Sequence, residues 1–114
     1  MPVPSPAAEL GERLVDAMAA LYGPHPGFRT AHARGICAEG VFTATAQAAD
    51  LSRAPHLQGV AVPALVRFSN GTGDPTVPDN SPDGRGLAVK LRLPGGGSTD
   101  MVGLSLPAFF VRTP

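Results

Sequence analysis

Tryptophan is absent from this 114-residue chain, and tyrosine and cysteine each occur only once. A single cysteine excludes an internal disulfide and any metal site built from several thiolates. Nine basic and nine acidic residues cancel, so the charge balance gives no reason to expect nucleic acid or an anionic membrane as a partner. No apolar run approaches the length of a membrane span. We therefore expect neither a nucleic-acid-binding protein nor a membrane protein.

Secretion signals are missing as well. Residues 1–6 contain neither a basic segment nor an apolar one, so no signal peptide is indicated and we expect a cytoplasmic protein. With 43% hydrophobic side chains, 114 residues provide at most one domain with a modest core.

The first regular element that the sequence predicts is an amphipathic helix. Ser5 is a suitable N-cap, Pro6 suits the first helical position, and Gly23 with Pro24 ends the pattern. The apolar stripe at helical spacing predicts a face that packs on something. It consists of Leu10, Leu14, Ala17, Met18 and Leu21. In the turn that follows, His25 stands between two prolines, and we expect it to be exposed and without a chemical role.

Beyond residue 31 the pattern changes to strands. Strand-like segments cover 32–43, 60–68, 85–93 and 99–106, with a short helix over 45–53. Cys37 in the first strand is interpreted as a small buried apolar residue. Tight turns between the later segments predict an antiparallel sheet with helices at one end, in the α+β class, with curvature that suits part of a barrel.

One histidine stands out as a candidate for proton chemistry. His32 lies at the boundary between helix and strand patterns, and imidazole is the side chain best suited to proton transfer near neutral pH. Taken alone, segment 28–35 favours a structural role for His32, in which it caps the strand or forms a hydrogen bond with a loop. Two other patterns are rejected: the glycine-rich loop 69–75 lacks a phosphate-binding motif, and Asp79 and Asp83 are typical of turns rather than of a metal site.

Several blocks together resemble the N-terminal part of haem catalases, most of all the small catalase-related peroxidases. The blocks are Arg-Thr-Ala-His-Ala-Arg-Gly at 29–35, Val-Arg-Phe-Ser at 66–69, Asp-Gly-Arg-Gly-Leu-Ala-Val-Lys at 83–90, and the pair 100–103 and 107–112. The resemblance implies the N-terminal part of a catalase-type antiparallel β-barrel. Residues 1–27 would form a helical arm, and residues 28–114 a partial catalase core on the distal side of the haem.

The resemblance also implies roles for individual residues. His32 would be the catalytic histidine that takes a proton from peroxide and returns it to the leaving oxygen, and Ser69 would orient its ring. Arg29 and Arg67 would pair with haem propionates.

Phe109 and Phe110 would line the apolar pocket over the haem. The implied cofactor is haem b, and the implied substrates are hydrogen peroxide and an organic electron donor; a homo-oligomer is left open. The resemblance therefore implies a catalase-type peroxidase that decomposes hydrogen peroxide in the response to this oxidant.

Two departures from the family pattern matter. Leu104 stands where catalases carry an asparagine that helps to hold peroxide, which predicts weaker dismutation relative to oxidation of an organic donor. The tyrosine that ligates iron in the family has no counterpart here, since Tyr22 lies in the wrong place, and we expect a truncated chain. The alternatives are a vestigial or interaction β-module that binds no haem, and a lipocalin-like carrier, which the strand count disfavours.

Overall fold

The computed structural model describes residues 5–108, which form an α+β arrangement. The chain divides into two compact units. Of the described residues, we call 5–35 with 69–84 the loop unit, and 36–68 with 85–108 the sheet unit. The predicted α+β class is confirmed.

The first helix, α1 (Pro6–Tyr22), has the predicted ends. The Ser5 hydroxyl accepts a hydrogen bond from the Ala8 amide at 3.3 Å, and Gly23 closes the helix by donating to the Ala19 carbonyl at 2.9 Å. No residue of α1 is buried, and the docking of its apolar stripe stays a prediction. None of the helices described between residues 5 and 108 has the length and apolarity that crossing a bilayer requires.

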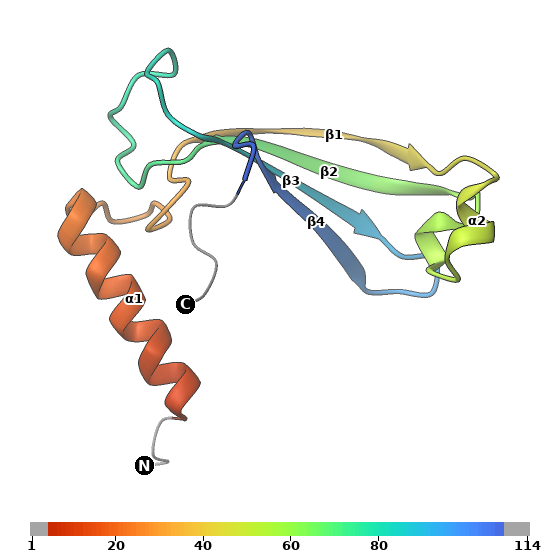
Figure 1. Cartoon of the computed structure of the whole chain (residues 1–114), viewed down its shortest axis with the longest axis horizontal. Helices are drawn as coiled ribbons and strands as arrows, with labels where there is room; N and C mark the ends of the chain where they lie inside the picture. The colour runs from red at the N-terminus through yellow and green to blue at the C-terminus, as the bar shows by residue number, and fades with distance from the viewer. Residues whose placement is uncertain (1–4, 109–114) are drawn as a thin grey trace. The chain divides into compact units, whose positions relative to one another are not determined.

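Four strands form one sheet in the order β1-β2-β3-β4. They are β1 (Gly35–Thr43), β2 (Ala61–Asn70), β3 (Arg85–Arg92) and β4 (Ser98–Leu104). In Figure 1 they lie side by side, with α2 (Ala48–Leu51) at the end of the sheet where β1 leads toward β2. The sheet is open, so β1 and β4 are its edges and it does not close into a barrel within residues 5–108.

The β3–β4 hairpin follows the sequence prediction closely. The strands are antiparallel, with Arg92 opposite Ser98 and Lys90 opposite Asp100. Gly96 and Gly97 in the turn have φ of 96° and 78°, a region that side chains rarely adopt. Across the hairpin, the Lys90 ammonium lies 2.7 Å from an Asp100 carboxylate oxygen.

Two segments differ from the predicted elements. The strand expected from residue 32 begins at Gly35, because His32 has φ 51° and such a backbone cannot continue into a strand. The helix expected over 45–53 is only the four-residue α2, followed by the short 3₁₀ helix Pro55–Leu57. Ser52 turns to an extended backbone, which ends the helix early.

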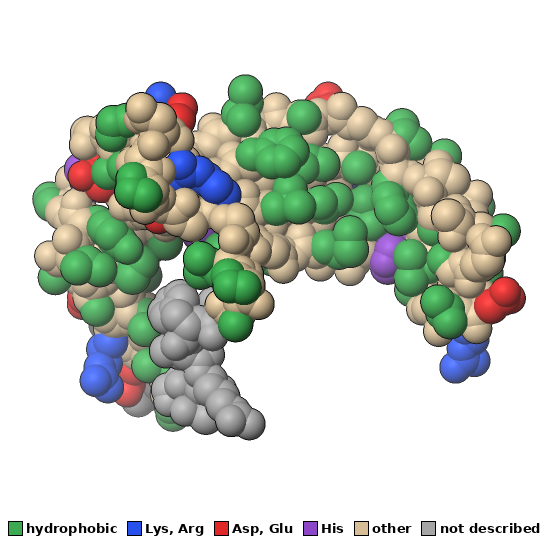
Figure 2. Space-filling model, turned by 45° about the horizontal axis from the view of Figure 1, so that its top comes forward, with side chains coloured by type: hydrophobic (Ala, Val, Ile, Leu, Met, Phe, Trp, Pro, Cys, Tyr) green, Lys and Arg blue, Asp and Glu red, His purple; other side chains and the backbone are tan. Residues whose placement is uncertain are grey.

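Few apolar side chains are buried. The buried apolar residues of the described chain are Ala33, Val62 and Leu91, whereas large apolar side chains remain in solvent on the outer strands. Val102 on β4 is 79% exposed and Ile36 on β1 is 72% exposed. Figure 2 shows such hydrophobic side chains gathered on the surface. Cys37 is exposed as well, so the prediction that it is buried was wrong: edge strand β1 has nothing packed over it within the described residues.

Candidate functional site

The structure brings His32 and Ser69 together, although they are 37 residues apart in sequence. A hydrogen bond of 3.1 Å joins His32 Nδ1 to Ser69 Oγ. The imidazole is half-buried and Ser69 is buried, both within the loop unit. One ring nitrogen of His32 is therefore engaged by a hydroxyl group.

Backbone pairing explains why these two side chains meet. The His32 amide donates to the Gly71 carbonyl at 3.2 Å, and the Ala33 amide donates to the Thr72 carbonyl at 3.1 Å. In the opposite direction, the Asn70 amide donates to the Arg34 carbonyl at 3.1 Å. The segment after the histidine therefore runs alongside the segment after the serine, which fixes their separation.

The loop that follows Ser69 is held by its own polar groups. An Asp83 carboxylate oxygen accepts from the Thr72 amide at 2.9 Å, and the Gly71 amide donates to the Gly84 carbonyl at 2.7 Å. A Cβ atom at Gly71 would lie 2.8 Å from that same carbonyl oxygen. Position 71 therefore has no space for a side chain unless the loop moves.

The other predicted site residues are Arg29, Arg67, Phe109 and Phe110. Arg29 is exposed in the loop unit and borders a cavity of about 50 Å³. Arg67 is half-buried on β2 in the sheet unit. Phe109 and Phe110 fall outside the described residues. The haem-related roles of all four therefore stay predictions.

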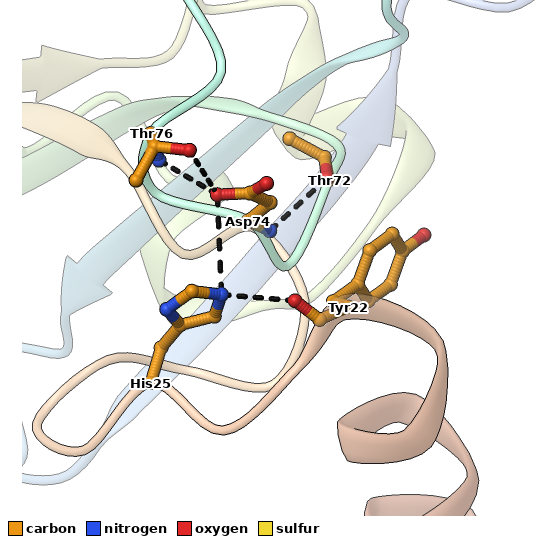
Figure 3. Close-up of polar contacts among 5 residues, drawn as sticks. All are labelled: Tyr22, His25, Thr72, Asp74 and Thr76. Carbon is orange, nitrogen blue, oxygen red and sulfur yellow. Dashed lines mark hydrogen bonds and ion pairs between the residues drawn. The ribbon is translucent and has the colours of Figure 1, made fainter.

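A second histidine forms contacts that the sequence did not reveal (Figure 3). His25 Nε2 lies 2.9 Å from the Tyr22 carbonyl oxygen and 3.9 Å from an Asp74 carboxylate oxygen. Its side chain is only 27% exposed, so the prediction of an exposed histidine was wrong. A histidine just past a helix end can bind one of the last carbonyls, and that position was the available signal.

Asp74, the carboxylate near His25, has its own polar partners. Hydrogen bonds from the hydroxyl and then the amide of Thr76 lower the pKa of Asp74, and the His25 charge adds a smaller effect in the same direction. These contacts join the end of α1 to the loop that contains Asp74 (Figure 3).

Metal-ligating side chains do not cluster in the part of the chain that is described. Within residues 5–108, no group of three or more His, Cys, Asp or Glu side chains is arranged to hold a metal ion. Asp83 instead binds a backbone amide, and Asp79 accepts from the Asn70 side chain at 3.0 Å.

Comparison with known proteins places these features in a family. The sequence pattern of the family described as catalase matches residues 14–114. A catalase-related peroxidase of Mycolicibacterium paratuberculosis is 50% identical over 90 residues, 79% of this chain and 29% of that protein. A catalase-related peroxidase of Synechococcus elongatus is 35% identical over 103 residues, 90% of this chain and 30% of that protein.

Plant catalases are similar over a shorter stretch. Catalase isozyme 2 of Cucurbita pepo is 43% identical over 86 residues, 74% of this chain and 17% of that protein. The chain thus spans less than a third of the length of each of these relatives. With a family match that covers nearly the whole sequence, the predicted resemblance is confirmed: the chain belongs to the catalase family.

Proposed function

We propose that this chain contributes the proton-transfer side of a haem-dependent site that decomposes hydrogen peroxide. The observation that carries the proposal is the 3.1 Å hydrogen bond between His32 Nδ1 and Ser69 Oγ. Membership of the catalase family supports peroxide as the substrate. The similarity to two catalase-related peroxidases supports an organic electron donor as the second substrate.

We assign His32 the neutral tautomer that carries its proton on Nδ1 and donates it to Ser69. When Nδ1–H donates to the Ser69 oxygen, the neutral ring carries its basic lone pair on Nε2. Nε2 then takes a proton from peroxide and later returns it to the departing oxygen, which leaves as water. Ser69 keeps the ring in one plane and one tautomer during both transfers.

The residues of this chain fit only the side of the haem on which peroxide would bind. When bound, it supplies the redox-active iron that accepts electrons from the donor and passes them to peroxide. The planar guanidinium groups of Arg29 and Arg67 are suited to carboxylates, so we assign them to the propionates. Tyr22 is not assigned as the protein ligand of the iron.

The fold is proposed to serve this site as part of a larger sheet. Strands β1–β4 would be the first strands of the family barrel, with residues 28–114 as the core and residues 1–27 as an arm. Apolar side chains exposed on β1 and β4 support this assignment, because a barrel covers such faces and removes both edges. Phe109 and Phe110 are proposed to line the haem pocket.

A haem titration of the 114-residue chain, followed by absorbance in the Soret region, tests the proposal. A sharp, saturating band with peroxide-dependent oxidation of an organic donor would support the proposal. In the haem-loaded chain, His32→Ala should lower the rate of donor oxidation by about 100-fold or more, the usual contribution of a positioned general base. Ser69→Ala should have a smaller effect in the same direction.

The control for these variants is His56→Ala, which removes an imidazole from the sheet unit and should leave the rate unchanged. Weak, non-saturating haem binding without donor oxidation would overturn the proposal. That outcome would instead favour a β-module that binds no haem.

A further inference from the structure

The His32 backbone is held in an unusual conformation. Its φ of 51° makes it the one non-glycine residue with positive φ within residues 5–108. A residue keeps such a backbone only where its surroundings over-determine it. The surroundings of His32 must therefore include contacts that hold both it and its partner segment in place.

A side-chain clasp lies directly beside the His32–Ser69 pair. Asn70, the residue after Ser69, is 7% exposed and its side-chain amide donates to one Asp79 oxygen at 3.0 Å. The other Asp79 oxygen accepts from Arg34 Nη2 at 3.4 Å. One carboxylate thus joins the residue that follows the serine to a residue just past the histidine, and all of these residues lie in the loop unit.

Asn70 and Arg34 are also joined through the backbone. The Asn70 amide donates to the Arg34 carbonyl at 3.1 Å, so main chain and side chains hold this pair of segments at one point. The Arg34–Asp79 ion pair is exposed and screened by water. Asn70, whose side-chain amide binds Asp79, is buried. The Asn70–Asp79 hydrogen bond is therefore the contact whose loss leaves a buried polar group unsatisfied.

We propose that Asn70 and Asp79 are positioning residues that hold the Ser69 hydroxyl at His32 Nδ1, an inference that rests on the proposed function of that pair. Asn70 fixes the strand that carries the serine, and Asp79 ties that strand to Arg34. Neither side chain is placed in contact with a substrate. Loss of the clasp leaves only backbone hydrogen bonds between the two segments, so the Ser69 hydroxyl is held less firmly at Nδ1 and the ring loses its preferred tautomer.

Nuclear magnetic resonance of the 114-residue chain labelled with ¹⁵N-histidine tests this inference without haem. In mildly alkaline buffer, the ring-nitrogen shifts report the tautomer of His32. We expect Asp79→Ala and Asn70→Ala to shift the Nδ1 signal toward that of imidazole in water. Asp79→Asn keeps an oxygen for the Asn70 amide and should retain the wild-type signal. Asn80→Ala, at the next exposed position, is the matched control.

Unchanged His32 signals in folded Asp79→Ala and Asn70→Ala would overturn the positioning role. Circular dichroism reports whether each variant folds, and if one unfolds, the other decides. Unfolding of both would also overturn it, because the clasp would then be a general stabilising contact.

A second readout separates this inference from the proposed function. In the haem-loaded chain, Asp79→Ala should lower kcat for donor oxidation about tenfold or more with little change in KM, as a misplaced catalytic group does. If the wild-type chain shows no such activity, the proposed function fails while the ring-nitrogen shifts still decide the positioning role.

Discussion

The loop unit and the sheet unit are stabilised in opposite ways. In the loop unit, the buried residues include Ser69 and Asn70, and carboxylates accept hydrogen bonds from backbone and side-chain amides. In the sheet unit, the most deeply buried side chains are Val62 and Leu91, and apolar residues of the outer strands stand in solvent.

The geometry of the candidate site and the hydrophobic core therefore depend on different units of the molecule. The His32–Ser69 contact is fixed by short polar contacts inside one unit, so it does not depend on a deep core. The sheet, in contrast, exposes large apolar side chains on its edge strands. Three predictions test how far the contrast extends.

The largest effect is expected in the sheet unit. Leu91 is fully buried on β3, so Leu91→Ala should lower the free energy of unfolding by about 3 kcal/mol through lost burial and a cavity. Val102→Ala, at a position that is 79% exposed, should change it by less than about 0.5 kcal/mol. Urea unfolding followed by circular dichroism measures both, and equal effects would contradict the assigned core.

A smaller loss is expected from the loop unit. A Cβ atom at Gly73 would collide with the Thr30 carbonyl oxygen and with the Tyr22 ring, so Gly73→Ala should cost about 2 kcal/mol. Gly40→Ala on β1 is the control, since nothing lies within 4 Å of a Cβ atom there. Thermal unfolding compares the two variants. A Gly73→Ala protein as stable as Gly40→Ala would show that this loop is not closely packed.

The smallest effect concerns acid stability. Hydrogen bonds from Thr76 lower the pKa of Asp74 below its ordinary value of 3.8, so the folded state favours the carboxylate. Its contribution is present above pH 3.8 and is lost as the pH falls through the lower pKa of the folded state. Thr76→Val should lower the free energy of unfolding above pH 3.8. It should also make that free energy depend less on pH below this value. Thr76→Ser keeps the hydroxyl and should restore the profile; an unchanged profile in Thr76→Val would refute the assignment.

Features set by neighbouring residues were predictable from the sequence. Ser5, Pro6 and Gly23 mark the ends of α1, and the glycines after residue 94 mark the β3–β4 hairpin. These signals act within one turn of chain, so composition and spacing reveal them.

Features set by distant residues were not predictable in the same way. The exposure of Cys37 and of the α1 stripe depends on what packs against them, which local patterns do not specify. Only the family resemblance, and not the local sequence, indicates proton chemistry at His32. Its bond to Ser69 arises from backbone pairing between segments far apart in sequence, and the Asn70–Asp79 contact carried no sequence signal at all.

Because the backbone of His32 is left-handed, the residue that would best stabilise the fold at this position differs from the residue that the proposed proton transfer requires. Glycine adopts such a φ freely, whereas a side chain there costs on the order of 1 kcal/mol. A laboratory selection for heat resistance alone would therefore enrich glycine at position 32 and discard the imidazole. A selection that also requires the proposed proton transfer would keep the histidine.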